Sequence, residues 1–426
     1  MPSIEIEPDN FSQTKAFLIT LQSSSISEEI ALANLEELRG LTATMGLSAV
    51  GSLVVKQREN HAKLLVGSGK AEEILQAADQ VQADMIVFDD DLSPTQQRNW
   101  EDFTQKIVID RQEVILEIFS QRALTREAVL QVALARMEYS LPRLTRSYTD
   151  LSRQRGGARN NRGGGEMKLE LDRRVILRKI DQFKRELIEV RAHRDRTRKQ
   201  RSISPLPRAA IVGYTNAGKS TLLNSLADAG VLEQDKLFAT LDPTTRKTAV
   251  ASGLHILVTD TVGFIQKLPH HLVDAFRSTL EEAIYADFLL HVIDVSHPQA
   301  EQQYELTNKV LADLGAGEKP QLLVLNKADK ATSINLAAWL NRFPEAISTS
   351  LVHGEGRDAL KAAVARLTLR LVPPLQFQIP LERGDLVAYL RKNGQVLSEA
   401  YEEEAIEVQA QVVPALLAPV RAWIKS

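Results

Sequence analysis

The residues most suited to chemistry form a phosphate-binding pattern near the middle of the chain. The strand-like run RAAIVG leads into GYTNAGKST, residues 213–221, and then into the helix-like run TLLNSLA. This G-x4-G-K-S pattern between a strand and a helix lets backbone N–H groups turn toward a phosphate. Lys219 supplies a positive charge to the β and γ phosphates, and the Ser220 hydroxyl is a magnesium ligand. The alternative, a plain glycine-rich turn, does not explain the flanking strand and helix.

Two further motifs follow in order along the chain. Asp260 ends the apolar run HILVTD, and Gly263 follows it in a D-x-x-G pattern, 41 residues after Lys219. A carboxylate at that strand end can hold magnesium through water, and a glycine N–H can meet the γ-phosphate. The run LLVLNKAD then ends in Asn326, Lys327 and Asp329. A carboxylate such as that of Asp329 accepts hydrogen bonds from guanine N1–H and N2–H₂, which adenine cannot donate in that pattern. The three motifs predict a P-loop GTPase that uses Mg²⁺.

The segment between the first two motifs, KLFATLDPTTRK (236–247), holds a further candidate magnesium ligand. A threonine here is expected to order its loop around magnesium and the γ-phosphate and to release it after hydrolysis. Thr240 is the first choice, and spacing alone leaves Thr244 and Thr245 as alternatives.

The residue after D-x-x-G bears on the rate of hydrolysis. Many GTPases place a glutamine there to orient the attacking water. Here Phe264 takes that place and Ile265 follows. A phenyl ring neither donates nor accepts the required hydrogen bond, so a slow basal rate and stimulation by a partner are expected.

Alternating strand-like and helix-like runs surround these motifs. Strands are predicted at 16–20, 48–55 and 84–90, with helices at 27–46 and 70–82, which indicates a small parallel α/β domain. A second α/β run occupies about 208–370. The tail is expected to form a strand (LQFQIP), a helix (GDLVAYLRKNG), a long strand or hairpin (395–413) and a final helix (PALLAPVRAWI), a small α+β appendage.

Residues 125–200 carry two apolar seams. Their members are spaced by four and three residues, which predicts an antiparallel helical hairpin; they are Leu130, Leu134, Met137, Leu141 and Leu144 in the first helix, and Ile176, Ile180, Phe183, Leu187 and Val190 in the second. Pro142 is expected to end or kink the first helix. The tip between them, RQRGGARNNRGGGEMK, is rich in Gly and Arg and predicts a loop.

The hairpin is also basic. Residues 143–201 hold 19 Lys and Arg against 8 Asp and Glu, a balance of +11 that leaves −14 on the rest of a chain whose net charge is −3. Such a block predicts a nucleic-acid contact, and a solvated helix face is the plain alternative. The candidates for RNA contact at the tip are Arg153, Arg155, Arg159 and Arg162. The expected domains are therefore 1–124, 125–200, 201–370 and 371–426.

Several classes of protein are excluded or disfavoured. No Cys occurs among the 426 residues, which excludes disulfides, zinc–thiolate sites and a cysteine nucleophile. No apolar run approaches the roughly 18 residues of a membrane span, and the acidic, polar N-terminus is not expected to be a signal peptide. The expected location is the cytoplasm or, peripherally, the membrane. Gly67-Ser68-Gly69-Lys70 resembles half a phosphate loop but is read as a strand-to-helix turn, and His270-His271 as a solvated pair.

The chain resembles the HflX family of translational GTPases. The matching pieces are GYTNAGKST, FATLDPT, DTVGFI and NKAD, together with VGSGKAEEI (66–74), FDDDLSPTQQRN (88–99), VIDRQEVILEIFSQRA (108–123) and LELDRR (169–174). The resemblance implies a factor that binds the large ribosomal subunit and its rRNA, reaches toward the peptidyl-transferase region with its hairpin, and splits stalled ribosomes under stress. It also implies that Thr240 is the magnesium threonine. A monomer that binds no DNA is expected. A GTPase acting in RNA modification or ribosome assembly is the alternative.

The resemblance and the motifs together give the expected site. The catalytic residues are Lys219, Thr240 and Gly263, and the metal ligands are Ser220 and Thr240. The residues expected to bind GTP or GDP are Gly213, Tyr214, Thr215, Asn216, Ala217, Gly218, Lys219, Ser220, Thr221, Phe238, Ala239, Thr240, Leu241, Asp242, Asp260, Thr261, Val262, Gly263, Asn326, Lys327, Ala328, Asp329, Ser350, Leu351 and Val352. Three features depart from the family: the tip reads GGARNNRGGGE where the family has GGxGxRGPGE, Leu351 replaces a smaller alanine, and the tail (371–426) matches the family only weakly.

Overall fold

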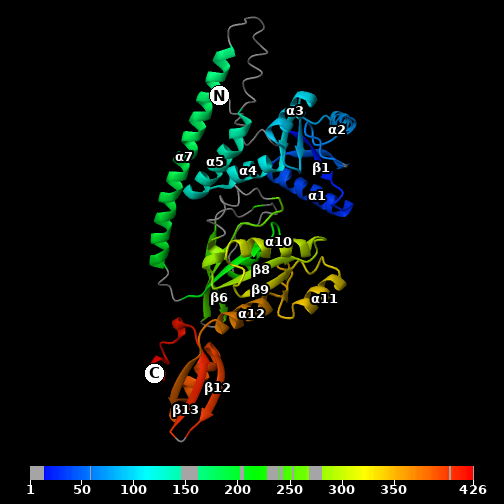
Figure 1. Ribbon diagram of the computed structural model, residues 1–426. Coiled ribbons are helices and arrows are strands. Elements are labelled where there is room, and N and C mark those ends of the chain that lie inside the picture. The colour runs from blue at the N-terminus through cyan, green and yellow to red at the C-terminus, as the bar shows by residue number, and fades with distance from the viewer. Residues whose placement is uncertain are drawn as a thin grey trace. The chain divides into compact units, whose positions relative to one another are not determined.

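The computed structural model describes residues 14–57, 59–144, 162–201, 206–227, 238, 243–251, 254–267, 281–402 and 404–425. The chain divides into two compact units, Met1–His193 with Lys267–Phe276, and Arg194–Gln266 with Arg277–Ser426. Figure 1 labels the helices and strands of both. Each unit is described by itself below.

The first unit contains a four-stranded parallel sheet. Its strands are β1 (Lys15–Gln22), β2 (Ser48–Lys56), β3 (Met85–Phe88) and β4 (Ile107–Asp110), in the order β2-β1-β3-β4. The helices between and after them are α1 (Glu28–Met45), α2 (Ser68–Gln80), α3 (Pro94–Thr104) and α4 (Arg111–Arg122). The predicted parallel α/β domain is confirmed. Sequence reasoning missed β4, which has only 4 residues, and the helices on either side of it.

Local signals explain where these elements begin and end. Ser93 caps α3 in a capping box with Gln96, the next residue is a proline, and the Trp100 indole N–H donates to Leu64 O at 3.0 Å. Gly46 ends α1 with a φ of 96°, in the left-handed region that suits glycine. Sheet strands and helices meet in one apolar core that includes Phe17, Phe88 and Trp100.

The same unit holds the pair of helices predicted from the two seams, the second of them as far as His193. They are α5 (Arg126–Ser140), followed by the short 3₁₀ turn η2 (Leu141–Arg143), and the long α7 (Arg162–Arg201), which Figure 1 shows as one continuous helix. Ion pairs join Lys184 to Glu138 and Arg191 to Glu127, so the helices run antiparallel. Helix α5 ends at Ser140, before Pro142, as expected.

The seam of α5 is shifted from the prediction. Its fully buried positions include Val132, Ala135 and Tyr139, while Leu134 and Met137 are only half-buried. Tyr139 explains the shift, because its hydroxyl donates to the buried carboxylate of Asp110 at 3.0 Å and draws that face of the helix inward. In α7, Ile180 and Leu187 are buried as the spacing predicts.

The second unit contains a six-stranded sheet in the order β10-β9-β8-β5-β7-β6. Its strands are β5 (Arg208–Gly213), β6 (Thr244–Ala251), β7 (Leu254–Asp260), β8 (Phe288–Asp294), β9 (Gln321–Asn326) and β10 (Ile347–Ser348). Only β6 is antiparallel to its neighbour, and the other pairs are parallel. The helices are α8 (Lys219–Ala227), α10 (Ala300–Asp313), α11 (Ser333–Arg342) and α12 (Arg357–Arg370). This is the predicted P-loop α/β architecture.

A small antiparallel sheet ends the chain. Strands β11 (Leu375–Pro380), β13 (Ala405–Gln411) and β12 (Gln395–Tyr401) lie in that order, with the turn η3 (Leu381–Arg383) and helix α13 (Gly384–Asn393) between β11 and β12. The predicted final helix over PALLAPVRAWI is wrong. That segment holds only the 3₁₀ turns η4 (Pro414–Leu416) and η5 (Arg421–Trp423), because Pro419 lacks the N–H that a continuous helix needs there.

Candidate functional site

The phosphate loop is shaped by glycines that have no room for a side chain. Gly213 ends β5 with a φ of 144°, and a Cβ there would lie 2.3 Å from Val292 O. Gly218 has a φ of 100°, and its Cβ would lie 2.2 Å from Asn326 Nδ2. Asn216 between them is also left-handed, with a φ of 59°. The loop therefore turns closely around the start of α8, where free backbone N–H groups suit an anion.

Lys219, the first residue of α8, lies buried under the loop. Its Nζ donates to Tyr214 O at 2.6 Å, and the side chain is 7% exposed. Burial lowers the pKa of Lys219 from 10.5 to about 8, although Asp260 acts in the opposite direction. A buried cation beside the loop suits a site that binds phosphate.

Ser220, a predicted magnesium ligand, is in contact with Asp260, the carboxylate that is expected to hold magnesium through water. The Ser220 hydroxyl donates to Asp260 Oδ2 at 2.8 Å, and Asp260 is 1% exposed at the end of β7. Hard divalent cations take oxygen ligands such as a hydroxyl and a carboxylate. The chemistry of these two oxygens fits Mg²⁺, which Ser220 would hold directly and Asp260 through water.

Gly263 lies directly against the phosphate loop. A Cβ on it would lie 2.7 Å from Lys219 Nζ and 2.8 Å from Thr215 Cα, so no other residue fits. The segment continues with Phe264, whose N–H donates to Gly213 O at 3.1 Å and whose carbonyl accepts from Thr215 N–H at 2.8 Å. Phe264 and Ile265 are buried. Thr261 and Val262 are buried as well, and the Thr261 hydroxyl donates to Ile211 O at 2.6 Å.

The base-reading motif connects to the same loop. Asn326 Nδ2 donates to Ala217 O at 2.8 Å, which joins the end of β9 to the phosphate loop. Lys327 has a φ of 58° and pairs with Asp294 at 2.7 Å. Ala328 N–H donates to Thr349 O at 3.1 Å. Phosphate-contacting and base-contacting groups thus belong to one site at the carboxyl ends of β5, β7 and β9.

Asp329 is oriented by the loop after β10. Its Oδ1 accepts from the Ser350 hydroxyl at 2.6 Å, and His353 Nε2 lies 3.8 Å from Oδ2. The hydrogen bond from Ser350 lowers the pKa of Asp329 below its usual 3.8. The carboxylate is therefore ionised at neutral pH, as an acceptor for guanine must be.

The departure at Leu351 is accommodated by the core. Leu351 is 6% exposed and packs with the apolar core of the second unit, while its N–H donates to Asn326 Oδ1 at 3.3 Å. Val352 is 78% exposed. The larger side chain thus turns inward and leaves the backbone of Ser350–Val352 beside the base-reading motif.

Other predicted residues divide into three groups. Thr221 lies on α8. Phe238 is buried, and its φ is 55°. The alternatives Thr244 and Thr245 lie on β6, where the hydroxyls of Thr245 and Thr259 are 2.9 Å apart. Outside the described residues lie Ala239, Thr240, Leu241, Asp242, Arg153, Arg155, Arg159, His270 and His271. Arg162 is the first residue of α7, so the loop predicted over 153–168 is wrong for 162–168, which are helical.

Sequence reasoning missed two polar partners of the base-reading motif. Asp294 holds Lys327, and it could have been found as a carboxylate at the end of the buried run FLLHVID. His353 next to Asp329 carried no motif signal. The segment Gly67-Ser68-Gly69-Lys70, which resembles half a phosphate loop, leads into α2, and Gly67 is the extended residue just before that helix. Lys70 pairs with Glu73 at 2.6 Å on the surface, in keeping with the predicted strand-to-helix turn.

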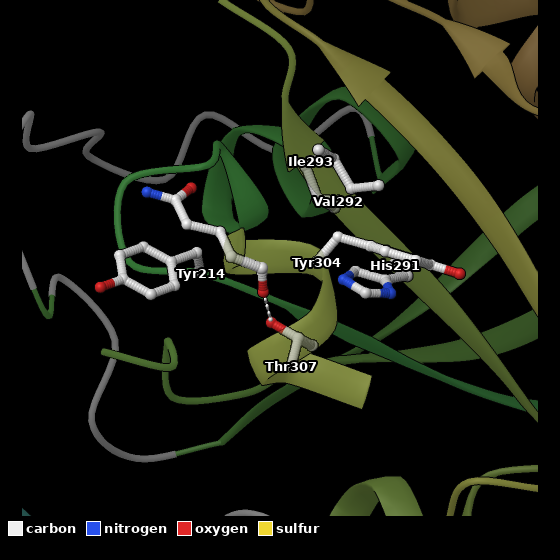
Figure 2. A pocket seen from close by; sticks show the side chains of 7 residues that line it. Tyr214, His291, Val292, Ile293, Tyr304 and Thr307 are labelled. Carbon is white, nitrogen blue, oxygen red and sulfur yellow. Dashed lines mark hydrogen bonds between the residues drawn. The ribbon is translucent and has the colours of Figure 1, made fainter. Parts of the chain in front are cut away.

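A small hollow lies behind the phosphate loop. Figure 2 shows Tyr214 on one side of it and His291 with Tyr304 on the other. The His291 ring stacks on Tyr304 at 5.2 Å between centroids, and burial lowers its pKa to about 4, so the imidazole is neutral. The hollow encloses no space that could take a ligand. It is a packing gap beneath the site.

The described ranges hold neither a membrane-spanning helix nor a metal-binding cluster. No helix there combines the length and apolarity that crossing a bilayer requires. Over the same ranges, no three His, Asp or Glu side chains gather into a metal-binding group.

Three family profiles match successive parts of the chain. Their descriptions are GTP-binding GTPase N-terminal for residues 33–120, GTP-binding GTPase Middle Region for 122–201, and 50S ribosome-binding GTPase for 208–327. Together they follow the chain from α1 to the end of the base-reading motif.

Similar proteins extend over nearly the whole chain. A protein named GTPase HflX from Akkermansia muciniphila is 45% identical over 424 residues, and the alignment covers 96% of each of the two chains. Another GTPase HflX, from Lacrimispora saccharolytica, is 44% identical over 401 residues, with 94% of each chain covered. Among solved structures, the complex of SsGBP with GDP shares 25% identity with a TM-score of 0.50, covering 84% of this chain and 99% of that one.

Proposed function

The chain belongs to the HflX family of GTPases, and from that premise we propose that it binds the large ribosomal subunit and dissociates stalled or idle ribosomes. It hydrolyses GTP to GDP and phosphate. The family description of its P-loop domain names a 50S ribosome-binding GTPase, which supports the choice of partner. We place its action in the cytoplasm, where ribosomes are.

The roles of the phosphate-side residues follow from their positions. Lys219, buried beside the loop, neutralises charge on the β and γ phosphates once GTP is bound. Ser220 and Thr240 would hold Mg²⁺, and Asp260, which accepts a hydrogen bond from Ser220, would hold it through water; the ion would supply electrostatic stabilisation of the charge on the phosphates. The Gly263 N–H meets the γ-phosphate, and the absence of a Cβ lets the backbone approach Lys219.

The base-side residues select guanine. Asp329 accepts from guanine N1–H and N2–H₂, and the Ser350 hydroxyl holds the carboxylate in place. Asn326 fixes the phosphate loop through Ala217 and supports the loop that carries Leu351. The remaining motif residues line the nucleotide through their backbone.

Hydrolysis is slow until a partner acts. The position that often carries a water-orienting glutamine holds Phe264, a buried side chain without a polar atom. We infer that the ribosomal subunit orders the site or supplies the missing group. The requirement for a partner would confine GTP turnover to the ribosome-bound state.

The basic hairpin supplies the surface for rRNA. It combines the +11 balance of residues 143–201 with an exposed face on α7, where Arg173, Arg174 and Arg178 project from the helix. Phosphate contacts by Arg and Lys provide most of the affinity of such interfaces. Stress is the condition under which idle and stalled ribosomes accumulate, so we propose a stress-response role.

One observation carries the nucleotide assignment: Asn326 of the base-reading motif donates to Ala217 of the phosphate loop at 2.8 Å, so the two motifs form one site. Co-sedimentation with purified large subunits tests the ribosomal role, comparing a non-hydrolysable GTP analogue with GDP. Binding with the analogue and loss of light scattering from intact ribosomes are expected. If the protein bound large subunits with neither nucleotide, the ribosomal proposal would be overturned, although the GTPase activity would still stand. The alternative, a GTPase acting in RNA modification or ribosome assembly, would then be favoured.

A further inference from the structure

A tyrosine side chain joins the phosphate loop to the segment that carries Gly263. Tyr214 is part of the loop, and its hydroxyl accepts a hydrogen bond from the Gln266 N–H at 2.8 Å. Both residues belong to the second compact unit, and Tyr214 is 5% exposed. Figure 2 shows the hydroxyl directed away from His291 and Tyr304. The polar end of this side chain therefore serves the Gln266 contact and not the hollow behind the loop.

Two backbone hydrogen bonds join the same two pieces of chain. The Phe264 N–H donates to Gly213 O at 3.1 Å, and the Thr215 N–H donates to Phe264 O at 2.8 Å. Tyr214 and Phe264 thus face each other as an isolated parallel bridge. Neither backbone bond involves a residue after Phe264. The Tyr214 hydroxyl extends the attachment by two residues, to Gln266.

The position of Gly263 leaves little tolerance for movement of this segment. A Cβ there would lie 2.7 Å from Lys219 Nζ and 2.8 Å from Thr215 Cα. In the function proposed above, the Gly263 N–H meets the γ-phosphate. A misplacement of about 1 Å in such a site can cost about a hundredfold in rate. A contact that holds the residues after Gly263 against the loop therefore bears directly on hydrolysis.

The surroundings make the Tyr214 hydroxyl hard to replace by water. Phe264 and Ile265, which precede Gln266, are buried, and Gln266 itself is half-buried. A backbone N–H that loses its acceptor in such a place is costly, so the chain is driven to move until the N–H reaches a new partner. Without the hydroxyl, the segment would be held only as far as Phe264.

The main chain of the same tyrosine has a separate role. Its carbonyl oxygen accepts from Lys219 Nζ at 2.6 Å, which places it among the groups that bind nucleotide. Tyr214→Phe keeps that carbonyl, the ring and the loop backbone and removes only the hydroxyl. The substitution therefore separates the Gln266 contact from nucleotide binding.

We propose that Tyr214 is a positioning residue for GTP hydrolysis: its hydroxyl holds Gln266 and so keeps the segment from Gly263 to Gln266 against the phosphate loop. The inference rests on the role proposed above for Gly263, and not on the ribosomal partner. GDP has no γ-phosphate for Gly263 to meet, so GDP binding does not depend on this placement. Loss of the hydroxyl slows GTP hydrolysis and leaves GDP affinity unchanged.

The test uses the full chain without ribosomes. Tyr214→Phe removes the acceptor, Gln266→Pro removes the donor N–H, and the double variant removes both. Single-turnover GTP hydrolysis and equilibrium binding of a fluorescent GDP are measured for each. Each single variant is expected to lower the hydrolysis rate several-fold, with GDP affinity within about twofold of wild type. The double variant should be no slower than the slower single variant, because both remove one contact.

Tyr304→Phe is the matched control. It removes a hydroxyl from a half-buried tyrosine of the same unit and should leave both measurements unchanged. Wild-type turnover in Tyr214→Phe would overturn the proposal, and so would an equal loss in the control. A parallel loss of GDP affinity, or additive losses in the double variant, would also overturn it, because these would indicate a general structural role.

Gly263→Ala separates failure of this proposal from failure of the role on which it rests. If Gly263→Ala abolished turnover while Tyr214→Phe kept the wild-type rate, only the positioning role of the tyrosine would be lost. If Gly263→Ala itself hydrolysed GTP at the wild-type rate, the role of Gly263 would be lost, and the proposal for Tyr214 with it.

Discussion

The Ser220 hydroxyl donates to Asp260 Oδ2 at 2.8 Å, although the two residues are 40 positions apart in the sequence. One lies in the first turn of α8, the helix after β5, and the other ends β7, the strand beside β5. The contact brings a neutral and a charged oxygen together beside Lys219, where Ser220 would hold a magnesium ion and Asp260 would hold it through water.

Ser220→Ala should therefore weaken magnesium-dependent GTP binding. The variant removes one metal ligand and leaves the phosphate loop intact, so affinity in magnesium should fall by about tenfold or more. Affinity in EDTA should change little. A titration with fluorescent GTP in both conditions measures this, with Ser225→Ala on the same helix as control. Equal magnesium dependence in Ser220→Ala and wild type would contradict the assignment.

Lys219 predicts a dependence on pH. In the free protein, burial holds its pKa at about 8, below the ordinary 10.5. Because the folded pKa is depressed, the folded protein loses the proton first as pH rises, and phosphate binding must restore it. GTP affinity should thus weaken as pH rises through about 8. Calorimetry in buffers of different ionisation enthalpy should detect proton uptake on binding above that pH.

The control for this pH effect is Lys219→Ala. It should bind GTP weakly at every pH, because the cation is absent, and should show no proton uptake attributable to this position. An affinity for GTP in wild type that stays flat across the same range would show that another group carries the phosphate charge.

Base choice should depend on Asp329. Asp329→Asn replaces an acceptor with an amide and should shift preference from guanine toward xanthine. Loss of a charged hydrogen bond costs roughly 1.5–3 kcal/mol of GTP affinity. Competition between GTP and XTP measures the shift, with Asp313→Asn at the end of α10 as control. If Asp329→Asn kept wild-type GTP affinity, the motif would not read the base.

The basal rate of GTP hydrolysis should be slow because Phe264 cannot orient the attacking water. Purified protein should turn GTP over slowly and accelerate with large subunits. Phe264→Ala should leave the basal rate unchanged or raise it, because it frees space for water without removing a polar group. Steady-state phosphate release with and without subunits tests this. A fast basal rate that subunits do not change would contradict the role given to this position.

The shape of the phosphate loop could be predicted from the sequence, because each motif is a local pattern with a characteristic backbone geometry. A glycine pattern between a strand and a helix has few structural solutions, so Gly213, Gly218 and Lys219 could be placed from sequence. The partners that arise from the fold could not. Asp294 reaches Lys327, and Lys267 reaches Asp89 across 178 positions; no local pattern encodes such contacts.

The errors elsewhere have the same origin. The helix predicted over PALLAPVRAWI has an apolar pattern, but Pro419 interrupts its hydrogen bonds, and the segment packs as two 3₁₀ turns against the small sheet. The seam of α5 is rotated because the polar tip of Tyr139 is satisfied by Asp110 inside the first unit. The spacing of apolar residues cannot predict a buried hydrogen bond such as that between Tyr139 and Asp110.

The last prediction concerns the basic tip of the hairpin. Replacing its four arginines by Ala should weaken binding to large subunits and leave GTP affinity of the free protein intact, since the phosphate loop begins only at Gly213. The variant changes Arg153, Arg155, Arg159 and Arg162. Each arginine that neutralises a phosphate releases counterions, so the slope of log affinity against log salt should become shallower by roughly three units if all four make contacts. A uniform loss of affinity without a change in slope would instead indicate a packing role.

Equilibrium binding at several salt concentrations decides between the two. The matched control removes four exposed arginines of the second unit, Arg342, Arg366, Arg370 and Arg383, and so makes the same change in net charge away from the hairpin. If charge alone steers association, both variants should lose affinity alike. If the tip contacts rRNA, only the hairpin variant should lose both affinity and slope. Unchanged values in both would make the hairpin a solvated helix pair, and the +11 balance of residues 143–201 would have no ribosomal role.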